Sequence, residues 1–231
     1  MSAATASPIV VAIDGPAASG KSSTAQWVAK KLGFRHVDSG ALYRAATARA
    51  MLSGGAPESW SEGDVIRVAS EIGIVPQGTS FVPSIAGVPL GDEIRGAAVT
   101  AHVSRVAQMA TVRAWVNAMV QAAATRDNIV VDGRDMGTVV FPAAAVKIFL
   151  VADPWERARR RLTQRLGRAP ADEEIAAETE AIVRRDAQDA TQTLQARDAI
   201  LIDTTYLTQA EQVDRIVALV RSVTDADRAR G

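Results

Sequence analysis

A short glycine-rich loop near the start of the chain lies between two segments with different patterns. Residues 9–13 (IVVAI) are apolar and rich in β-branched side chains, which is typical of a strand buried on both faces. Residues 23–32 (STAQWVAKKL) predict a helix that ends at Gly33. The loop between them, residues 15–22 (GPAASGKS), matches the pattern G-x-x-x-x-G-K-[ST]. This order of strand, loop and helix predicts an α/β domain that binds a phosphate chain.

The chemistry of this loop predicts how ATP and Mg²⁺ would be held. Successive backbone N–H groups and the start of the helix surround the β-phosphate. Lys21 reaches the β and γ oxygens, and the hydroxyl of Ser22 ligates Mg²⁺. The alternative interpretation is an ordinary glycine turn. The predicted ATP-binding residues are Gly15, Pro16, Ala17, Ala18, Ser19, Gly20, Lys21, Ser22 and Ser23.

The rest of the chain repeats the alternation of strand and helix. Apolar runs at residues 128–131, 146–151 and 199–202 are separated by segments with helical patterns, which predicts a parallel sheet flanked by helices. The clearest helix is expected over residues 99–123, where apolar side chains recur at helical spacing. Residues 73–96 have prolines and glycines but no helical period, so they predict a small antiparallel β insertion.

The composition excludes several other classes of protein. The chain has 231 residues, 26 Lys+Arg, 26 Asp+Glu and no cysteine, so a disulfide scaffold, a thiolate zinc site and a thiol nucleophile are excluded. The balanced charge argues against nucleic acid as a partner. The leader MSAATAS lacks the charged and apolar regions of an export signal, and no apolar run is long enough to span a membrane. We therefore expect a cytoplasmic protein with neither a nucleic acid nor a membrane as partner.

The segment DSGALYR, residues 38–44, begins a helix after an expected second strand. Arg44 lies in the first turn of this helix, beside the crevice at the carboxyl ends of the strands, and it suits an acceptor phosphate. Two alternatives remain open from the sequence. Asp38 or Ser39 is also a suitable helix N-cap, and Arg44 is equally compatible with a place on the surface.

A second charged segment, DGRDMGT, comes directly after the strand at residues 128–131. Asp132 occupies the position of the acidic residue that holds the water shell of magnesium in phosphate-loop enzymes. Arg134 can bind phosphate, and Asp135 can accept a hydrogen bond from the exocyclic amine of a base, as selection of cytosine requires. This segment therefore predicts part of an acceptor-nucleotide site.

Residues 155–168 carry six arginines and one acidic residue. Near a triphosphate, such a cluster is typical of a mobile lid that brings positive charge to the transferring phosphoryl group, whereas the alternative is a solvated helix face. The chain lacks the Asn/Thr-Lys-x-Asp motif with which GTPases read guanine. The run LSGG at residues 52–55 superficially matches a transporter-ATPase signature, but it comes too soon after the phosphate loop and is better explained as a helix end.

Five segments, in this order and spacing, closely resemble bacterial cytidylate kinases: IDGPAASGKSSTA, DSGALYR, GDEIR, DGRDMGTVVFP and KIFLVADPWERARRR. The similarity covers residues 9–220. It implies an ATP-dependent kinase that transfers the γ-phosphoryl group to CMP or dCMP with Mg²⁺. Separately, we expect the protein to be a monomer. It also implies a discontinuous P-loop core (9–38, 125–153 and 195–222), a monophosphate-binding domain (39–124) with the β insertion, and a lid with its following helix (154–194).

The resemblance also implies roles for individual residues. Lys21 and the lid residues Arg157 and Arg161 are expected to act in catalysis, and Ser22 and Asp132, the latter through water, are expected to hold Mg²⁺. The residues implied to bind CMP are Ser39, Tyr43, Arg44, Ser104, Arg113, Arg134, Asp135, Arg185 and Asp189.

Two points of the resemblance conflict with the sequence itself. Ser104 and Arg113 are nine residues apart, and a continuous α-helix places such residues on opposite faces, so they can share a ligand only if the helix breaks between them. No proline marks a break. In addition, the family usually has an arginine where this chain has Gln192, so one phosphate ligand is either missing or supplied by Arg197.

Two rival functions are left open by the residues. The first is a kinase for another small acceptor, such as UMP, AMP or shikimate. The second is a nucleotide-dependent switch or an RNA-binding ATPase that uses the arginine-rich helix. The first predicts ADP release with a different acceptor, and the second predicts RNA-stimulated hydrolysis without CDP.

Overall fold

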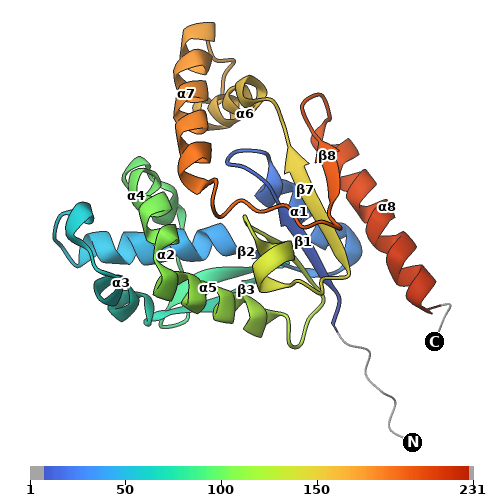
Figure 1. Ribbon diagram of the computed structural model, residues 1–231, viewed down its shortest axis with the longest axis horizontal. Coiled ribbons are helices and arrows are strands. Elements are labelled where there is room, and N and C mark those ends of the chain that lie inside the picture. Colours follow the sequence, from blue (N-terminus) through green and yellow to red (C-terminus); the bar gives the residue numbers. More distant parts are fainter. Residues whose placement is uncertain (1–7, 229–231) are drawn as a thin grey trace, which may run out of the picture.

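One twisted sheet organises residues 8–228, which are the residues that the computed structural model describes (Figure 1). The seven-residue leader, from which no export was expected, lies outside them. The strand order is β3-β4-β2-β6-β1-β7-β8, and β5 pairs with β4. The strands are β1 Val10–Asp14, β2 Arg35–Asp38, β3 Ile72–Gln77, β4 Ser80–Ile85, β5 Val88–Pro89, β6 Ile129–Asp132, β7 Val146–Val151 and β8 Ile200–Asp203. From β4 to β8 all neighbouring strands on this path are parallel, so the predicted parallel sheet is confirmed.

Helices cover both faces of this sheet. They are α1 Lys21–Leu32, α2 Ser39–Leu52, α3 Glu62–Ala69, α4 Ala97–Gln108, α5 Ala110–Ala123, α6 Pro154–Leu166, α7 Asp172–Asp189 and α8 Gln209–Arg228, with short helical turns at Pro57–Ser59, Asp92–Arg95 and Met136–Val140. Val11 and Ile13 of β1 pack in one core with α1 and α8, whereas Ala12 packs in the other with α2 to α5. Burial on both faces explains the unbroken apolar runs of the sequence.

The expected β insertion is an antiparallel hairpin that belongs to the main sheet. β3 and β4 pair along their whole length, and β5 adds two residues beyond the next turn. Strand β4 then pairs in parallel with β2, with His36 opposite Ser80 and Val37 opposite Phe81. The hairpin therefore extends the core sheet at one edge and does not form a sheet of its own.

The prediction of one helix over residues 99–123 is wrong. Helix α4 ends at Gln108, and Met109 has an extended backbone (φ −70°, ψ 119°) before α5 begins. The carboxylate of Glu62 accepts hydrogen bonds from the N–H groups of Ala110 and Thr111, both at 3.0 Å, and so caps the second helix. The cap comes from a residue far away in the sequence, which is why the local pattern does not reveal the break.

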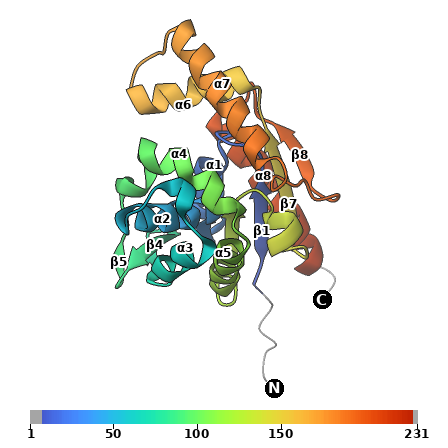
Figure 2. The same cartoon turned by 60° about the vertical axis from the view of Figure 1, so that its left-hand side comes forward.

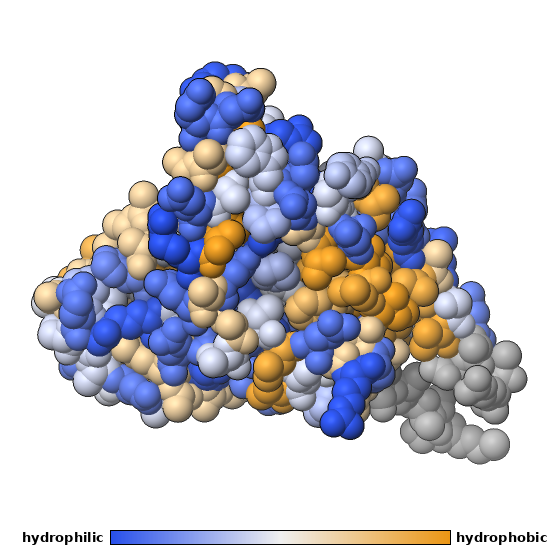
Figure 3. Space-filling model, turned by 45° about the horizontal axis from the view of Figure 1, so that its top comes forward, coloured by the Kyte–Doolittle hydropathy of each residue, from blue (hydrophilic) through white to orange (hydrophobic). Residues whose placement is uncertain are grey.

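Helices α6 and α7 pack against each other and form an arm beside the sheet (Figures 1 and 2). A small apolar cluster joins them, made of Ala158, Leu162, Ile175 and Ile182. On the face that Figure 3 shows, hydrophilic residues predominate at the projecting end of the arm. Among residues 8–228, no helix combines the length and the hydropathy that a membrane span requires.

Candidate active site

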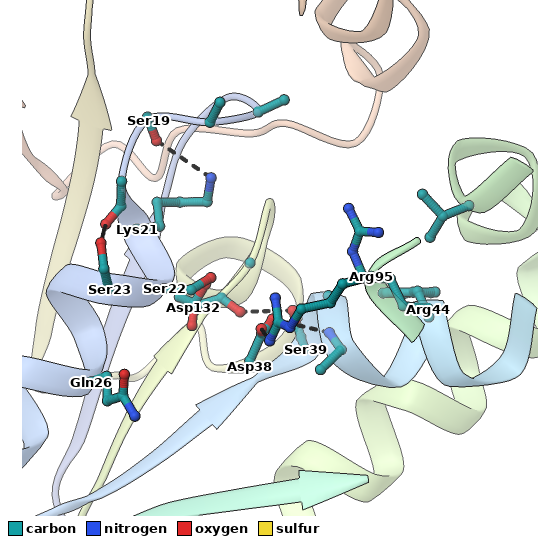
Figure 4. A pocket seen from close by; sticks show the side chains of 18 of the residues that line it. Ser19, Lys21, Ser22, Ser23, Gln26, Asp38, Ser39, Arg44, Arg95 and Asp132 are labelled. Atoms are coloured by element: carbon teal, nitrogen blue, oxygen red, sulfur yellow. Dashed lines mark hydrogen bonds and ion pairs between the residues drawn. The ribbon is translucent and has the colours of Figure 1, made fainter. Parts of the chain in front are cut away.

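A cavity of about 1510 Å³ lies at the carboxyl ends of β1, β2 and β6. The phosphate loop, the start of α2, the hairpin, α4, the loop after β6 and the arm all contribute to its walls. Lys21, Arg44 and Arg134 line this same cavity, so the structure brings the expected phosphate-loop lysine and the two expected acceptor arginines together. Figure 4 shows several of these side chains pointing into the shared space.

The phosphate loop is held by contacts that its glycines and lysine make possible. At Gly15 (φ +147°) a Cβ atom would lie 2.2 Å from the carbonyl oxygen of Leu150, so no larger residue fits there. The Nζ of Lys21 donates to the carbonyl of Pro16 at 2.6 Å. Gly15 and Pro16 shape the loop from behind, whereas residues 17–23 line the cavity.

The surroundings of Lys21 disfavour its positive charge. Its side chain is buried, and burial together with the positive charge of Arg134 holds its pKa well below the usual value, although Asp132 and Asp14 oppose this shift. A phosphate group beside Lys21 would supply the missing negative charge and favour the ammonium form.

Asp132 and Ser22 form the candidate magnesium site. The hydroxyl of Ser22 donates to Oδ2 of Asp132 at 2.5 Å, and the side chain of Asp132 is buried. Oxygen donors of this kind suit Mg²⁺. Within residues 8–228 no group of three or more His, Cys, Asp or Glu residues could hold a metal ion by itself.

Three arginines, Arg44, Arg134 and Arg185, bring positive charge to the side of the cavity that is expected to bind the acceptor. Arg134 lies 3.3 Å and Arg185 3.7 Å from the same oxygen of Asp189, so two guanidinium groups share one carboxylate. Burial, followed by the charge of Arg134, lowers the pKa of Arg185 to about 10. Arg44 donates to the neutral hydroxyl of Thr100 at 2.9 Å. Within residues 8–228, the Nε atoms of Arg134 and Arg185 have no hydrogen-bond partner.

Four predicted residues meet at the end of the cavity that is expected to bind the base. Arg113 forms an ion pair with Asp135 and donates to the carbonyl of Ala107 at 3.1 Å. Burial raises the pKa of Asp135, and Arg113 partly offsets this effect. Ser104 lines the same cavity as Arg113, from which the break at Met109 separates it. The hydroxyl of Tyr43 is buried and, within residues 8–228, lacks a hydrogen-bond partner.

The start of α2 resolves which residue caps that helix. Asp38 accepts a hydrogen bond from the N–H of Ala41 at 3.0 Å and is the N-cap. The hydroxyl of Ser39 instead donates to the carbonyl of Asp132 at 2.8 Å, at the floor of the cavity. Ser39 therefore ties α2 to the end of β6.

The two predicted lid arginines occupy different positions. Arg161 lines the cavity and pairs with Glu178 at 3.3 Å. Arg157 does not line the cavity: it is buried, pairs with Asp186 at 2.6 Å, and donates to the carbonyl of Ala17 at 2.8 Å. Arg157 thus contacts the phosphate loop from behind.

Sequence reasoning assigned no role to several residues of the site. His36 lies 2.7 Å from Asp132, and Arg95 lies 3.3 Å from Asp38. Although burial opposes the charged form of His36, its hydrogen bond to Asp132 and the charge of that residue raise its pKa.

Asp14 accepts hydrogen bonds from the N–H groups of Met136 and Gly137, both at 2.8 Å. Of His36, Arg95 and Asp14, only Arg95 could have been found from the sequence, because it ends the family-like segment GDEIR.

The structure also bears on the position where the family usually has an arginine and this chain has Gln192, for which Arg197 was the possible replacement. Gln192 lines the cavity, whereas Arg197 is exposed and is not among the lining residues. The structure therefore does not bring Arg197 to the place of the missing arginine.

The sequence matches the protein family described as Cytidylate kinase over residues 11–222. A cytidylate kinase from Chlorobaculum tepidum is 38% identical, with 94% of this chain and 95% of the relative covered. One from Salinibacter ruber is 41% identical, with 93% and 97% covered. One from Geobacillus kaustophilus is 42% identical, with 92% and 96% covered.

Proposed function

Because the chain belongs to the cytidylate kinase family and is a phosphotransferase with cytidylate kinase activity, we propose that it transfers the γ-phosphoryl group of ATP to CMP or dCMP. The products are ADP and CDP or dCDP. The observation that carries this proposal is the single cavity that combines the phosphate loop, bearing Lys21, with the arginines Arg44, Arg134 and Arg185. Two phosphorylated ligands can meet there end to end.

The donor side holds the phosphates of ATP. The N–H groups of the phosphate loop and the start of α1 surround the β-phosphate, and Lys21 contacts the β and γ oxygens. Ser22 and Asp132 would hold Mg²⁺, Asp132 through water. The ion neutralises charge on the β and γ oxygens when it is bound.

The acceptor side orients the monophosphate. Arg44 and Arg134 bind its phosphate group, and Arg185 and Asp189 contribute from α7. Asp135 accepts a hydrogen bond from the exocyclic amine of cytosine. The remaining contacts to CMP are made by Ser39, Tyr43, Ser104 and Arg113. A uracil base, which has a carbonyl oxygen at that position, would face a carboxylate with no proton to donate.

The transfer itself requires little beyond positioning and charge. A phosphate oxygen of CMP forms a bond to the γ-phosphorus while the bond from that phosphorus to the β-phosphate oxygen of ATP breaks in line. No general base is required because the acceptor is already an anion at neutral pH. Lys21 and the lid residue Arg161, which both line the cavity, supply positive charge to the transferring group, whereas Arg157 acts only through its contact with the phosphate loop.

The larger organisation follows the same proposal. Residues 9–38, 125–153 and 195–222 form the core, residues 39–124 bind the monophosphate, and residues 154–194 act as the lid. We place the enzyme as a monomer in the cytoplasm, where its nucleotides are found. Gel filtration with light scattering tests the oligomeric state.

Product analysis tests the reaction. The enzyme is incubated with ATP, Mg²⁺ and each nucleoside monophosphate separately, and the products are separated by ion-exchange chromatography. CDP and dCDP are expected from CMP and dCMP, with much less UDP from UMP and no ADP release from AMP or shikimate. Equal rates with UMP and CMP would contradict the role of Asp135, and RNA-stimulated ATP hydrolysis without CDP would contradict the proposal as a whole.

A further inference from the structure

His36 is a buried side chain to which the proposed reaction assigns no role. It lies on β2, between the hairpin strand β4 and the end of β6. Its Nδ1 atom is 3.2 Å from the hydroxyl of Ser80, its neighbour across the β2–β4 ladder, and its Nε2 atom is 2.7 Å from Oδ1 of Asp132. Both partners are buried as well. His36 therefore links the hairpin to the carboxylate beside the phosphate loop.

The direction of the His36–Asp132 hydrogen bond follows from the chemistry of the two groups. An ionised carboxylate can only accept, so Nε2 of His36 carries the hydrogen and donates it to Asp132. The other oxygen of the carboxylate accepts from Ser22. A hydroxyl that ligates a metal ion through an oxygen lone pair can still donate its hydrogen, so Ser22 and His36 each fix a different oxygen of the Asp132 carboxylate.

We propose that His36 is a positioning residue that holds the Asp132 carboxylate in the orientation required by the Mg²⁺–nucleotide complex, with Ser80 holding the ring of His36. This inference rests on the proposed function, in which Ser22 and Asp132 hold Mg²⁺. Hydrogen-bonded partners of metal-site carboxylates commonly act in this way, and their loss typically costs about 10- to 100-fold in metal affinity or activity. A histidine that only filled space could be replaced by an apolar side chain without such a loss.

Three substitutions separate positioning from packing. His36→Leu removes the donor and keeps an apolar side chain of similar bulk. His36→Gln places an amide N–H donor at a comparable distance from the backbone. The matched control is His102→Leu. His102 is the other of the two histidines of the chain; it lies on α4, where its ring forms a T-shaped contact with the ring of Trp60, and it does not line the cavity.

The measurement is the affinity for a non-hydrolysable ATP analogue, determined by calorimetry with and without Mg²⁺. In His36→Leu the gain in affinity on adding Mg²⁺ is expected to fall by about tenfold or more, while the affinity without Mg²⁺ stays the same. His36→Gln should recover most of the gain, and His102→Leu should behave as the wild type. In kinetics, the Mg²⁺ concentration for half-maximal rate should rise in His36→Leu, with the KM for CMP unchanged.

The inference would be overturned if Mg²⁺ increased the affinity of His36→Leu for the ATP analogue as much as it does in the wild type. It would also be overturned if His36→Leu and His36→Gln lost this Mg²⁺-dependent gain equally. Asp132→Asn distinguishes this outcome from failure of the proposed function. If Asp132→Asn keeps the full gain, the proposed magnesium role of Asp132 is wrong. If it loses the gain and His36→Leu does not, only the inference about His36 fails. Should His36→Leu not fold, Ser80→Ala serves instead, with an expected loss of about two- to tenfold, and an unchanged gain there counts against the inference.

Discussion

The cations of the cavity differ in the partners that hold them. Arg134 and Arg185 share the single carboxylate of Asp189, and Arg44 contacts only a neutral hydroxyl among its hydrogen-bond partners in residues 8–228. Lys21 donates to a backbone carbonyl. These groups retain unsatisfied positive charge, so an incoming phosphate gains charge-assisted hydrogen bonds without first breaking strong ion pairs.

This difference leads to a prediction for Lys21, Arg44 and Arg134. Lys21→Met should lower kcat by more than about 100-fold, because each lost charge-assisted hydrogen bond in the transferring group costs about 1.5–3 kcal/mol. Arg44→Gln and Arg134→Gln should raise the KM for CMP far more than the KM for ATP. The control is Arg49→Gln, since Arg49 pairs with Glu71 outside the cavity. Steady-state kinetics with each substrate varied in turn measures these effects, and an unchanged KM for CMP in both arginine variants would refute the acceptor site.

Asp14 gives a prediction about pH and stability. Burial raises its pKa to about 6, although the N–H groups of Gly137 and Met136 oppose the shift. The folded protein therefore binds a proton more tightly at Asp14 than the unfolded chain does. As the pH rises from about 4 to above 6, this group should lower the free energy of unfolding by up to about 3 kcal/mol.

Asp14→Asn removes that titration, so the wild type should lose stability relative to the variant over this pH range. Urea unfolding at a series of pH values measures the difference, with Asp214→Asn on the exposed surface as control. Parallel pH profiles for wild type and Asp14→Asn would show that Asp14 does not carry this shift.

At the scale of elements, the sequence predicts what local patterns determine. The phosphate loop, the buried parallel strands and the hairpin all have signals within about 30 residues, and their positions agree with the structure. The break at Met109 has no such signal, because the cap on α5 comes from Glu62. His36 and Asp14 were missed for a similar reason: their importance comes from partners 96 and 122 residues away in the sequence.

Glu62 allows the helix break to be tested. Glu62→Ala removes the acceptor for the N–H groups of Ala110 and Thr111, so the first turn of α5 should fray, and with it the position of Arg113. We expect a higher KM for CMP, an unchanged KM for ATP and a lower melting temperature. The control is Glu180→Ala, an exposed acid paired with Arg184. A lower melting temperature with an unchanged KM for CMP would show that the cap matters for stability but not for the acceptor site.

The carboxylate of Glu62 also gives this cap a pH dependence. Hydrogen bonds from Thr111 and Ala110 hold the pKa of Glu62 below its usual value. The stabilisation by the ionised group is therefore present above the ordinary pKa of glutamate and is lost as the pH falls through the lowered value. The difference in melting temperature between wild type and Glu62→Ala should shrink in acid.

At the scale of the whole molecule, the arm of α6 and α7 contacts the phosphate loop through Asp186, through Arg157 and through the packing of Ala18 on the apolar cluster of the arm. Asp186 on α7 accepts from the N–H of Ala17 at 3.0 Å and pairs with Arg157 of α6, which itself donates to the carbonyl of Ala17. The loop, α6 and α7 thus meet at one residue. The arm also contacts the body through Arg160, which donates to the carbonyls of Thr204 and Thr205 at 2.5 and 2.7 Å.

This connection predicts how the arm responds to nucleotide. Asp186→Ala leaves the N–H of Ala17 and the buried guanidinium of Arg157 without their carboxylate, so amide hydrogen exchange in α7 and in the phosphate loop should become faster in the empty protein. Binding of a non-hydrolysable ATP analogue supplies phosphate oxygens to the loop, and the difference between variant and wild type should then decrease. Mass spectrometry of peptides covering residues 15–32 and 172–189 measures both states. Glu180→Ala on the same helix is the control, and equal exchange of Asp186→Ala and wild type in the empty protein would show that the arm is held by its apolar contacts instead.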